Sequence, residues 1–247
     1  MCYRARAVSA VASRENIRLY ELVLENGISA SPYVWRTRFA LAHKGLAFQS
    51  VPLGFTEIAA AFSGELRTVP VIEDGEERVG DSWHIADYLE RSYPARPALF
   101  SGCAEYAMVR LFDAWFSAEI LRRMFRSYVL DIHNAARPAD RLYFRTSREA
   151  RLQGTSLEAC VADRVSRLPE LRDALNPLRA QLERGPFLGG ASPNYADYLA
   201  LGAFRWVASV STIPPLAQGD PLLAWLERGF DLYGGLARDA RLKPLAQ

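Results

Sequence analysis

One stretch decides how the first part of this chain folds: Ser29-Ala30-Ser31-Pro32-Tyr33-Val34-Trp35-Arg36. An alternating apolar run at 17–23 precedes it and predicts a strand, and an apolar stripe at helical spacing follows it and ends at Lys44-Gly45. Pro32 suits the first position of a helix, which makes Ser31 the expected N-cap. The free N–H groups and the dipole of such a helix start favour an anion, although a simple cap has the same pattern.

The bulk composition excludes several classes of protein. The 247 residues allow one large domain or two ordinary ones, and the net charge of +2 favours neither nucleic acid nor a membrane surface as a partner. Cys2, Cys103 and Cys160 are few and far apart, and the three histidines lack metal-ligand spacing. We therefore expect a cytoplasmic protein without a bound metal. Residues 1–16 lack the apolar segment of a secretory signal and are expected to be a flexible extension.

Residues 17–93 have the pattern of a small α/β domain. A second short strand at 47–52 completes a strand–helix–strand unit, whose two strands should be parallel. A short helix is expected within 55–62, and two further strands flank Asp74-Gly75, which is a hairpin signal. Pro70 lies at the start of an apolar strand, where a cis bond before it would explain its placement.

Residues 104–247 have helical periodicity throughout, after a linker at 94–103. A long amphipathic helix is expected first, and the weak, arginine-rich pattern of 134–154 predicts a loop with a short helix. Asn194 is the expected cap of a later helix. The remaining helices are predicted at 168–182, 198–210 and 221–233. The sequence thus predicts an α/β domain followed by an all-α domain.

Three motifs, in this order and spacing, resemble the glutathione transferase superfamily. Ser31-Pro32-Tyr33 opens the first helix, Thr68-Val69-Pro70 precedes the hairpin, and Asp81-Ser82 opens the third helix. Residues 194–197 resemble the capping motif of that family's helical domain, with Asn where Ser or Thr is commoner. The resemblance implies a thioredoxin-like, glutathione-binding domain followed by a C-terminal helical bundle, the glutathione transferase fold, and a homodimer.

The residue identities in several segments indicate one branch of this superfamily. Ser-Pro-Tyr-Val-Trp-Arg-Thr at 31–37, Val-Pro-Val-Ile at 69–72 and Asp-Ser-Trp at 81–83 are similar to the bacterial glutathione-dependent β-aryl etherases, which attack lignin-derived dimers. Such an enzyme would use glutathione thiolate to displace a phenol from a β-O-4 aryl ether ketone, with no metal. Two alternatives stay open: a glutathione transferase that conjugates or isomerises another electrophile, and a non-catalytic binding or scaffold protein.

The resemblance also implies roles for individual residues. Ser31 would activate the thiol of glutathione, and Ser29 is the alternative, because some branches of the family place this serine earlier. Arg67 is a candidate for the glycyl carboxylate or a solvated surface charge. Glutathione would be bound by Val69, Pro70, Asp81 and Ser82. An aromatic second substrate is expected between the two domains. The candidate residues for its pocket are Tyr33, Trp115, Phe116, Met124, Tyr128 and Trp206.

Overall fold

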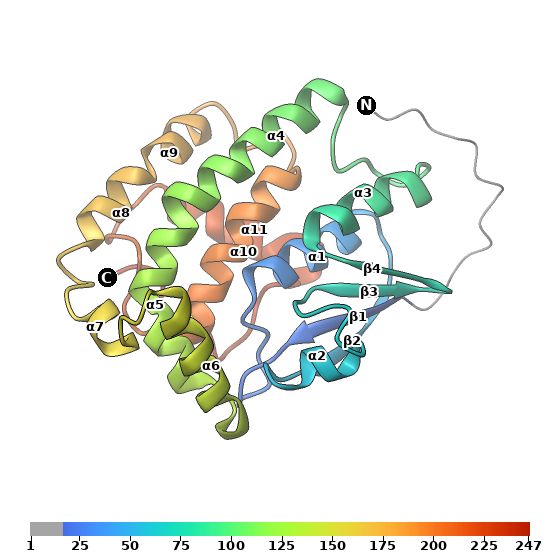
Figure 1. Cartoon of the computed structure of the whole chain (residues 1–247). Helices are drawn as coiled ribbons and strands as arrows, with labels where there is room; N and C mark the ends of the chain where they lie inside the picture. Colours follow the sequence, from blue (N-terminus) through green and yellow to red (C-terminus); the bar gives the residue numbers. More distant parts are fainter. Residues whose placement is uncertain (1–16) are drawn as a thin grey trace.

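The computed structural model describes residues 17–247, and the expected extension at 1–16 lies outside the described residues. A four-stranded sheet forms the first part of the molecule (Figure 1). Its order is β2-β1-β3-β4, with β1 and β2 parallel and β3 antiparallel to both β1 and β4. The strands are β1 (Ile17–Leu22), β2 (Phe48–Leu53), β3 (Val71–Asp74) and β4 (Glu77–Gly80).

Three helices accompany the sheet, and their starts agree with the sequence prediction. Helix α1 (Pro32–His43) joins the parallel strands β1 and β2, which confirms the expected strand–helix–strand unit. The short helix α2 (Glu57–Ala61) lies within the predicted range, and α3 (Ser82–Ser92) is capped by Asp81. Figure 1 shows α1 and α3 between the sheet and the helices that follow α3 in the chain. We call β1 to α3 the sheet region.

The hairpin differs from the prediction by one position. Asp74 pairs with Glu77 and is therefore the last residue of β3, so the loop is Gly75-Glu76, and Gly75 adopts a positive φ of 65°. The Asp74 side chain is 1% exposed and accepts hydrogen bonds from the hydroxyls of Tyr88 and Tyr93. These bonds explain why a residue typical of turns lies inside a strand.

The helical region begins with a long helix that contains a π-helical turn. Helix α4 (Cys103–Phe116) continues through the π turn η1 (Ser117–Leu121) into α5 (Arg122–Ala135). The prediction of a long amphipathic helix is therefore confirmed. The π turn is an addition that periodicity did not indicate, and such turns are frequent at functional sites.

The prediction for 134–154 is wrong. This segment forms a full helix, α6 (Pro138–Arg151), with Pro138 at its first position. Only Asp140 and Phe144 of this helix are fully buried. The helix therefore lacks the apolar stripe by which a helix is normally recognised in a sequence.

Three short helices follow α6, and the first of them, α7, was not predicted. The single helix expected at 168–182 is broken before Pro177, because a proline inside a helix removes a backbone hydrogen bond. Helix α11 (Leu222–Gly235) agrees with the last predicted helix. The short helices are α7 (Leu157–Val161), α8 (Leu168–Ala174) and α9 (Asn176–Leu182).

Helix α10 (Tyr195–Val210) holds the two regions together. Asn194 caps it, as predicted, in a capping box with Asp197, and every residue from Tyr195 to Ser209 is buried. A Cβ atom at Gly202 would lie 2.6 Å from the carbonyl oxygen of Pro32. The glycine therefore lets α10 approach the start of α1 closely. None of the helices within 17–247 combines the length and the apolar character that crossing a membrane requires.

Candidate functional site

A cleft of about 670 Å³ lies between the sheet region and the helical region. We call its two sides the sheet wall and the helical wall. The sheet wall brings together the start of α1, the segment before β3 and the start of α3. Its lining includes Ser31, Tyr33, Val69, Pro70, Asp81 and Ser82. The residues that the resemblance implies for glutathione binding and for thiol activation thus share one wall, with the exception of Ser29.

Ser31 is the N-cap of α1, as the sequence predicts. Its hydroxyl oxygen accepts a hydrogen bond from the backbone N–H of Val34 at 3.3 Å, and the residue is 7% exposed. A serine hydroxyl that accepts one bond still has its own O–H to donate. Ser31 can therefore donate to an anion that enters the cleft, at the positive end of the α1 dipole.

Ser29, the alternative, is placed differently. It is 6% exposed, its hydroxyl oxygen has no hydrogen-bond partner in the described structure, and it does not line the cleft. Its carbonyl oxygen accepts a hydrogen bond from the indole N–H of Trp35 at 3.0 Å. The two serines flank Ala30, and only Ser31 borders the cleft.

The second and third motifs meet beside Ser31. The Val69–Pro70 bond is cis, as expected, and the carbonyl oxygen of Pro70 accepts a hydrogen bond from the backbone N–H of Asp81 at 3.2 Å. Asp81 has a φ of 70°, which is unusual for a residue other than glycine. Its carboxylate caps α3 by accepting from the N–H groups of Trp83 and His84. A strained residue held at a cleft in this way is typical of a binding site.

Beside the cleft, a buried group of side chains joins the two regions. Asp113 of α4 pairs with the guanidinium of Arg36 of α1 at 3.1 Å and accepts a hydrogen bond from the indole N–H of Trp83 of α3. It also accepts from the hydroxyl of Ser117, which lines the cleft from the π turn. Arg36 is 1% exposed, and two of its nitrogens have no partner in the described structure.

The helical wall contains residues that sequence reasoning did not single out. They come from the π turn, from α5 and from α6, which lies in the segment that was predicted as a loop with a short helix. Trp206 of α10 was expected in the pocket and lines the cleft. The unexpected lining residues are Ser117, Leu121, Arg122, Phe125, Ile132, Tyr143, Phe144, Arg148 and Arg151.

Four residues expected in the pocket do not line this cleft. Phe116, Met124 and Tyr128 have no exposed surface and belong to the hydrophobic core, and burial raises the pKa of the Tyr128 hydroxyl well above its usual value. Trp115 is half-buried and packs against that core. The neighbouring helix face, which includes Phe125, meets the cleft instead. A repeat at helical spacing identifies an apolar face, but it does not show whether that face meets the core or a cavity.

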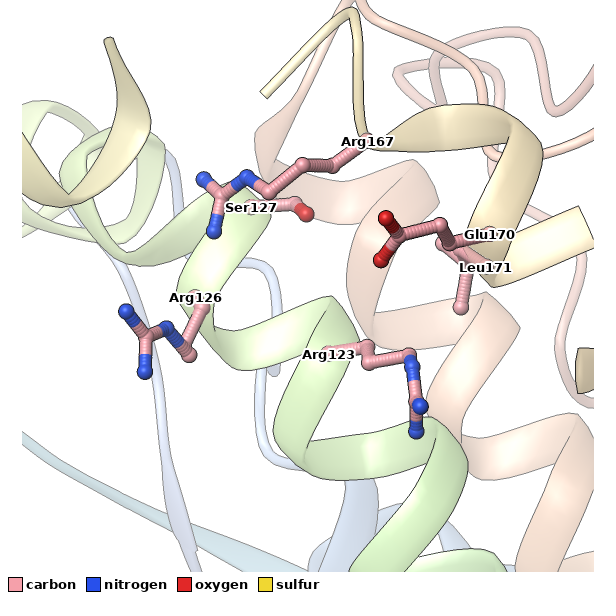
Figure 2. Close-up of a pocket in the computed structure, with 6 residues that line it drawn as sticks. All are labelled: Arg123, Arg126, Ser127, Arg167, Glu170 and Leu171. Carbon is pink, nitrogen blue, oxygen red and sulfur yellow. The ribbon is translucent and has the colours of Figure 1, made fainter. Parts of the chain in front are cut away.

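A second, smaller cavity of about 250 Å³ lies in the helical region (Figure 2). The residues that line it are Arg123, Arg126, Ser127, Arg167, Glu170 and Leu171. None of the three motifs reaches it. Two of its three arginines have carboxylate partners, since Arg123 pairs with Glu119 at 2.5 Å and Arg167 pairs with Asp163 at 3.0 Å. Within 17–247 no three histidine, cysteine, aspartate or glutamate side chains form a possible metal site.

Comparisons with known proteins agree with this architecture. The family model of the glutathione S-transferase N-terminal domain matches residues 27–97, and that of the C-terminal domain matches residues 107–213. A curated zeta-class glutathione S-transferase of Euphorbia esula is 37% identical over an alignment of 71 residues, and the match covers 26% of this chain. The chain spans about a third (31%) of the length of that relative.

Two solved structures are similar over most of the chain. A glutathione S-transferase of Ceriporiopsis subvermispora, solved in complex with glutathione, has a TM-score of 0.75 at 21% identity and covers 90% of this chain and 98% of its own. Glutathione transferase GSTFuA3 of Phanerochaete chrysosporium has a TM-score of 0.70 at 25% identity, over 90% and 93% of the two chains. The predicted fold, a thioredoxin-like domain followed by a helical domain, is confirmed.

Proposed function

This chain belongs to the glutathione S-transferase superfamily, and we propose that it binds glutathione on the sheet wall and transfers the sulfur to an aromatic electrophile held against the helical wall. The observation that carries the proposal is the convergence of Ser31, Val69-Pro70 and Asp81-Ser82 on one wall of a single cleft. A similar fold has been solved in complex with glutathione, which adds support for glutathione as the co-substrate.

Ser31 would activate the thiol. A cysteine thiol has a reference pKa of about 8.5, and lowering it by two units requires about 2.7 kcal/mol of preference for the thiolate. A hydroxyl that donates to a charged group supplies roughly 1.5–3 kcal/mol, and a helix N-terminus adds about 0.3–1 kcal/mol. The position of Ser31, with a free O–H at the start of α1, can therefore supply the free energy that activation requires.

The charged ends of glutathione would be bound by other residues of the sheet wall. The carboxylate of Asp81 would pair with the γ-glutamyl ammonium, while Ser82 and the free N–H groups at the start of α3 would take the γ-glutamyl carboxylate. Val69, before the cis bond, would bind the cysteinyl part through its main chain. Arg67 is exposed and lines the cleft, so it would take the glycyl carboxylate.

For the electrophile we propose a β-O-4 aryl ether ketone, because residues 31–37 resemble the bacterial β-aryl etherases. The thiolate would attack the carbon that bears the ether oxygen, next to the ketone. A carbon–sulfur bond forms, the carbon–oxygen bond breaks, and its electron pair leaves with a phenolate that takes a proton from water. The products would be a glutathionyl ketone and a free phenol. The protein would contribute thiolate formation and alignment of the two reactants.

Phenol release tests this proposal. The purified protein is incubated with glutathione and a β-aryl ether ketone, and phenol is quantified by chromatography, with controls that omit either the protein or glutathione. We expect release that requires both. A protein that binds glutathione but releases no phenol would be a transferase for another electrophile. A protein that binds no glutathione in a calorimetric titration would be a scaffold, and the proposed function would be wrong.

We also propose a homodimer, which the family resemblance implies, and a cytoplasmic location, which the three widely separated cysteines favour. Size-exclusion chromatography with light scattering checks the first part, since the 247-residue chain has a mass of 27.6 kDa and a dimer has twice this mass.

A further inference from the structure

We propose that the helical wall carries an anion subsite, formed by Arg148 and Arg151 of α6 with Arg122 of α5, and that the second substrate is an aromatic compound bearing a carboxylate. This inference rests on the proposed function, because it takes glutathione as the first substrate and an aromatic electrophile as the second, and it adds that the electrophile bears a carboxylate. Neither the motifs nor the family resemblance indicated these arginines.

The first observation is an imbalance of charge in the cleft. Four arginines line it, and Asp81 is the only carboxylate among the lining residues. Within residues 17–247, no carboxylate forms an ion pair with Arg122, Arg148 or Arg151. An array of positive charges in a partly enclosed cleft attracts anions strongly.

In the cavity of Figure 2, carboxylates compensate the charge of most of the arginines. There, Arg123 and Arg167 have carboxylate partners, and Glu170 is itself among the lining residues. Arginine is common throughout this chain, so its presence alone carries no information. Three arginines on one wall without a carboxylate partner distinguish the cleft from that cavity.

Arg148 is held in a defined position. Its guanidinium lies 4.7 Å from the centre of the Phe144 ring and 5.4 Å from that of Phe55, and one of its N–H groups donates to the hydroxyl of Ser147 at 2.9 Å. Burial, and then the positive charge of Arg151, lower the pKa of Arg148 below its usual value. Both effects mean that the charge of Arg148 is poorly compensated in the unliganded cleft. A bound carboxylate would compensate it.

The helix that carries Arg148 and Arg151 is fixed to the sheet region. Asp140 of α6 accepts hydrogen bonds from the backbone N–H of Thr56 at 2.8 Å and from its hydroxyl at 2.7 Å. The rings of Phe55 and Phe144 meet edge to face at 4.9 Å. Because these contacts position α6 before any ligand binds, an anion would find the arginines already oriented.

The position of the arginines favours the second substrate over glutathione. On the sheet wall, Asp81, the start of α3 and Arg67 would bind the charged ends of glutathione. The three unpaired arginines lie on the opposite wall, where Tyr143 and Phe144 also line the cleft. Aromatic faces beside guanidinium groups suit a flat aryl ring that carries a carboxylate.

Two S-substituted glutathiones test the subsite without requiring turnover. S-(4-carboxybenzyl)glutathione carries the proposed anion, and S-(4-methylbenzyl)glutathione is its neutral analogue of similar shape. Binding of each conjugate, and of glutathione itself, is measured by titration calorimetry at low and at high salt. We expect the carboxylated conjugate to bind about tenfold more tightly at low salt, and this preference to shrink as salt screens the charges.

The variants are Arg148→Gln, Arg151→Gln and the triple substitution of Arg122, Arg148 and Arg151 by glutamine. We expect the triple variant to bind the two conjugates equally, with the affinity for glutathione unchanged. Arg151 is exposed and unpaired in the described structure, so Arg151→Gln should fold and lose part of the preference even if Arg148→Gln is unstable. The matched control is Arg126→Gln, an exposed arginine one turn beyond Arg122 that lines the other cavity, and it should keep the full preference.

The outcomes separate this inference from the proposed function. Equal binding of both conjugates by the wild-type protein, with glutathione still bound, would overturn the anion subsite and leave the proposed function standing. A preference that the triple variant retains would also overturn it. If neither glutathione nor either conjugate binds, the proposed function is wrong and the subsite that rests on it is wrong as well.

Discussion

The two walls of the cleft hold their polar groups in different ways. On the sheet wall, Ser31 and Asp81 are fixed by backbone N–H groups two or three residues further along the chain. On the helical wall, Arg148 is placed by rings from both regions, and its helix is fixed through an interaction between Asp140 and Thr56, 84 residues apart. A cap formed by neighbouring residues can be the same in many proteins of one fold. A wall that depends on contacts between segments far apart in the sequence can differ from one such protein to the next. This difference suits a constant co-substrate on one wall and a selected electrophile on the other.

The largest effect is expected where the two walls are joined. Asp113→Ala removes the only ion-pair partner that Arg36 has in the described structure and leaves a guanidinium that is 1% exposed without compensation. Loss of one member of a buried pair costs about 3 kcal/mol of the free energy of unfolding. Urea unfolding followed by fluorescence measures this change.

The surface pair between Glu119 and Arg123 provides the control for Asp113→Ala. Both of its side chains are more than a third exposed, so Glu119→Ala should change the free energy of unfolding by less than about 0.5 kcal/mol. Equal effects of the two substitutions would show that Asp113 does not join the walls as we infer.

The next largest effect should come from the sheet wall and should not depend on the electrophile. Ser31→Ala removes the proposed donor to the thiolate, so kcat/KM should fall by about 100-fold for charged and neutral substrates alike. Glutathione bound to this variant should ionise near the reference thiol value of about 8.5. Thiolate absorbance against pH, together with steady-state rates, checks both expectations.

Ser29→Ala is the matched variant for this comparison. The hydroxyl of Ser29 is buried without a partner in the described structure, so its removal should leave activity and stability nearly unchanged. Loss of activity in Ser29→Ala, with Ser31→Ala active, would assign thiol activation to the earlier serine.

The difference between the walls also explains what could be predicted from the sequence. The caps formed by Ser31, Asp81 and Asn194 were predictable, because the residues that make each cap lie within three positions of one another. The full length of helix α6 was not predicted, because Phe144 is its only fully buried apolar residue. Its part of the cleft could not be predicted, since the position of Arg148 over Phe55 depends on contacts between distant segments.

A smaller effect, confined to the helical wall, is expected from Asp140→Ala. The substitution removes two hydrogen bonds to Thr56 and loosens α6 against the sheet region. We expect KM for the electrophile to rise by about fivefold, because the loss of ordered contacts at a wall weakens binding there by about 1 kcal/mol. KM for glutathione should not change. A rise in the KM of glutathione as large as that of the electrophile would show that the two walls are not independent.

The smallest effect lies away from both walls, at the other end of α1. The Nε2–H group of His43 donates to the carbonyl oxygen of Ala98, while Nδ1 accepts from the hydroxyl of Tyr198, so the neutral ring satisfies both neighbours. Burial, chiefly, and then the charge of Lys44 lower the pKa of His43 below 6.5, despite the bond to Ala98 and the charge of Glu90. The unfolded chain therefore binds a proton at a higher pH than the folded chain does.

As the pH falls below about 6.5, the stability contributed by neutral His43 should decline. Urea unfolding at pH 7.5 and 5.5 should show this loss in the wild-type protein and a smaller one in His43→Asn, whose side-chain oxygen can still accept from Tyr198. The preference for the carboxylated conjugate should be the same at both pH values, since its carboxylate and the arginines keep their charges throughout this range. If the preference for the carboxylated conjugate instead decreased together with the stability, the helical wall would depend on the far end of α1. The two walls would then not be held independently of each other.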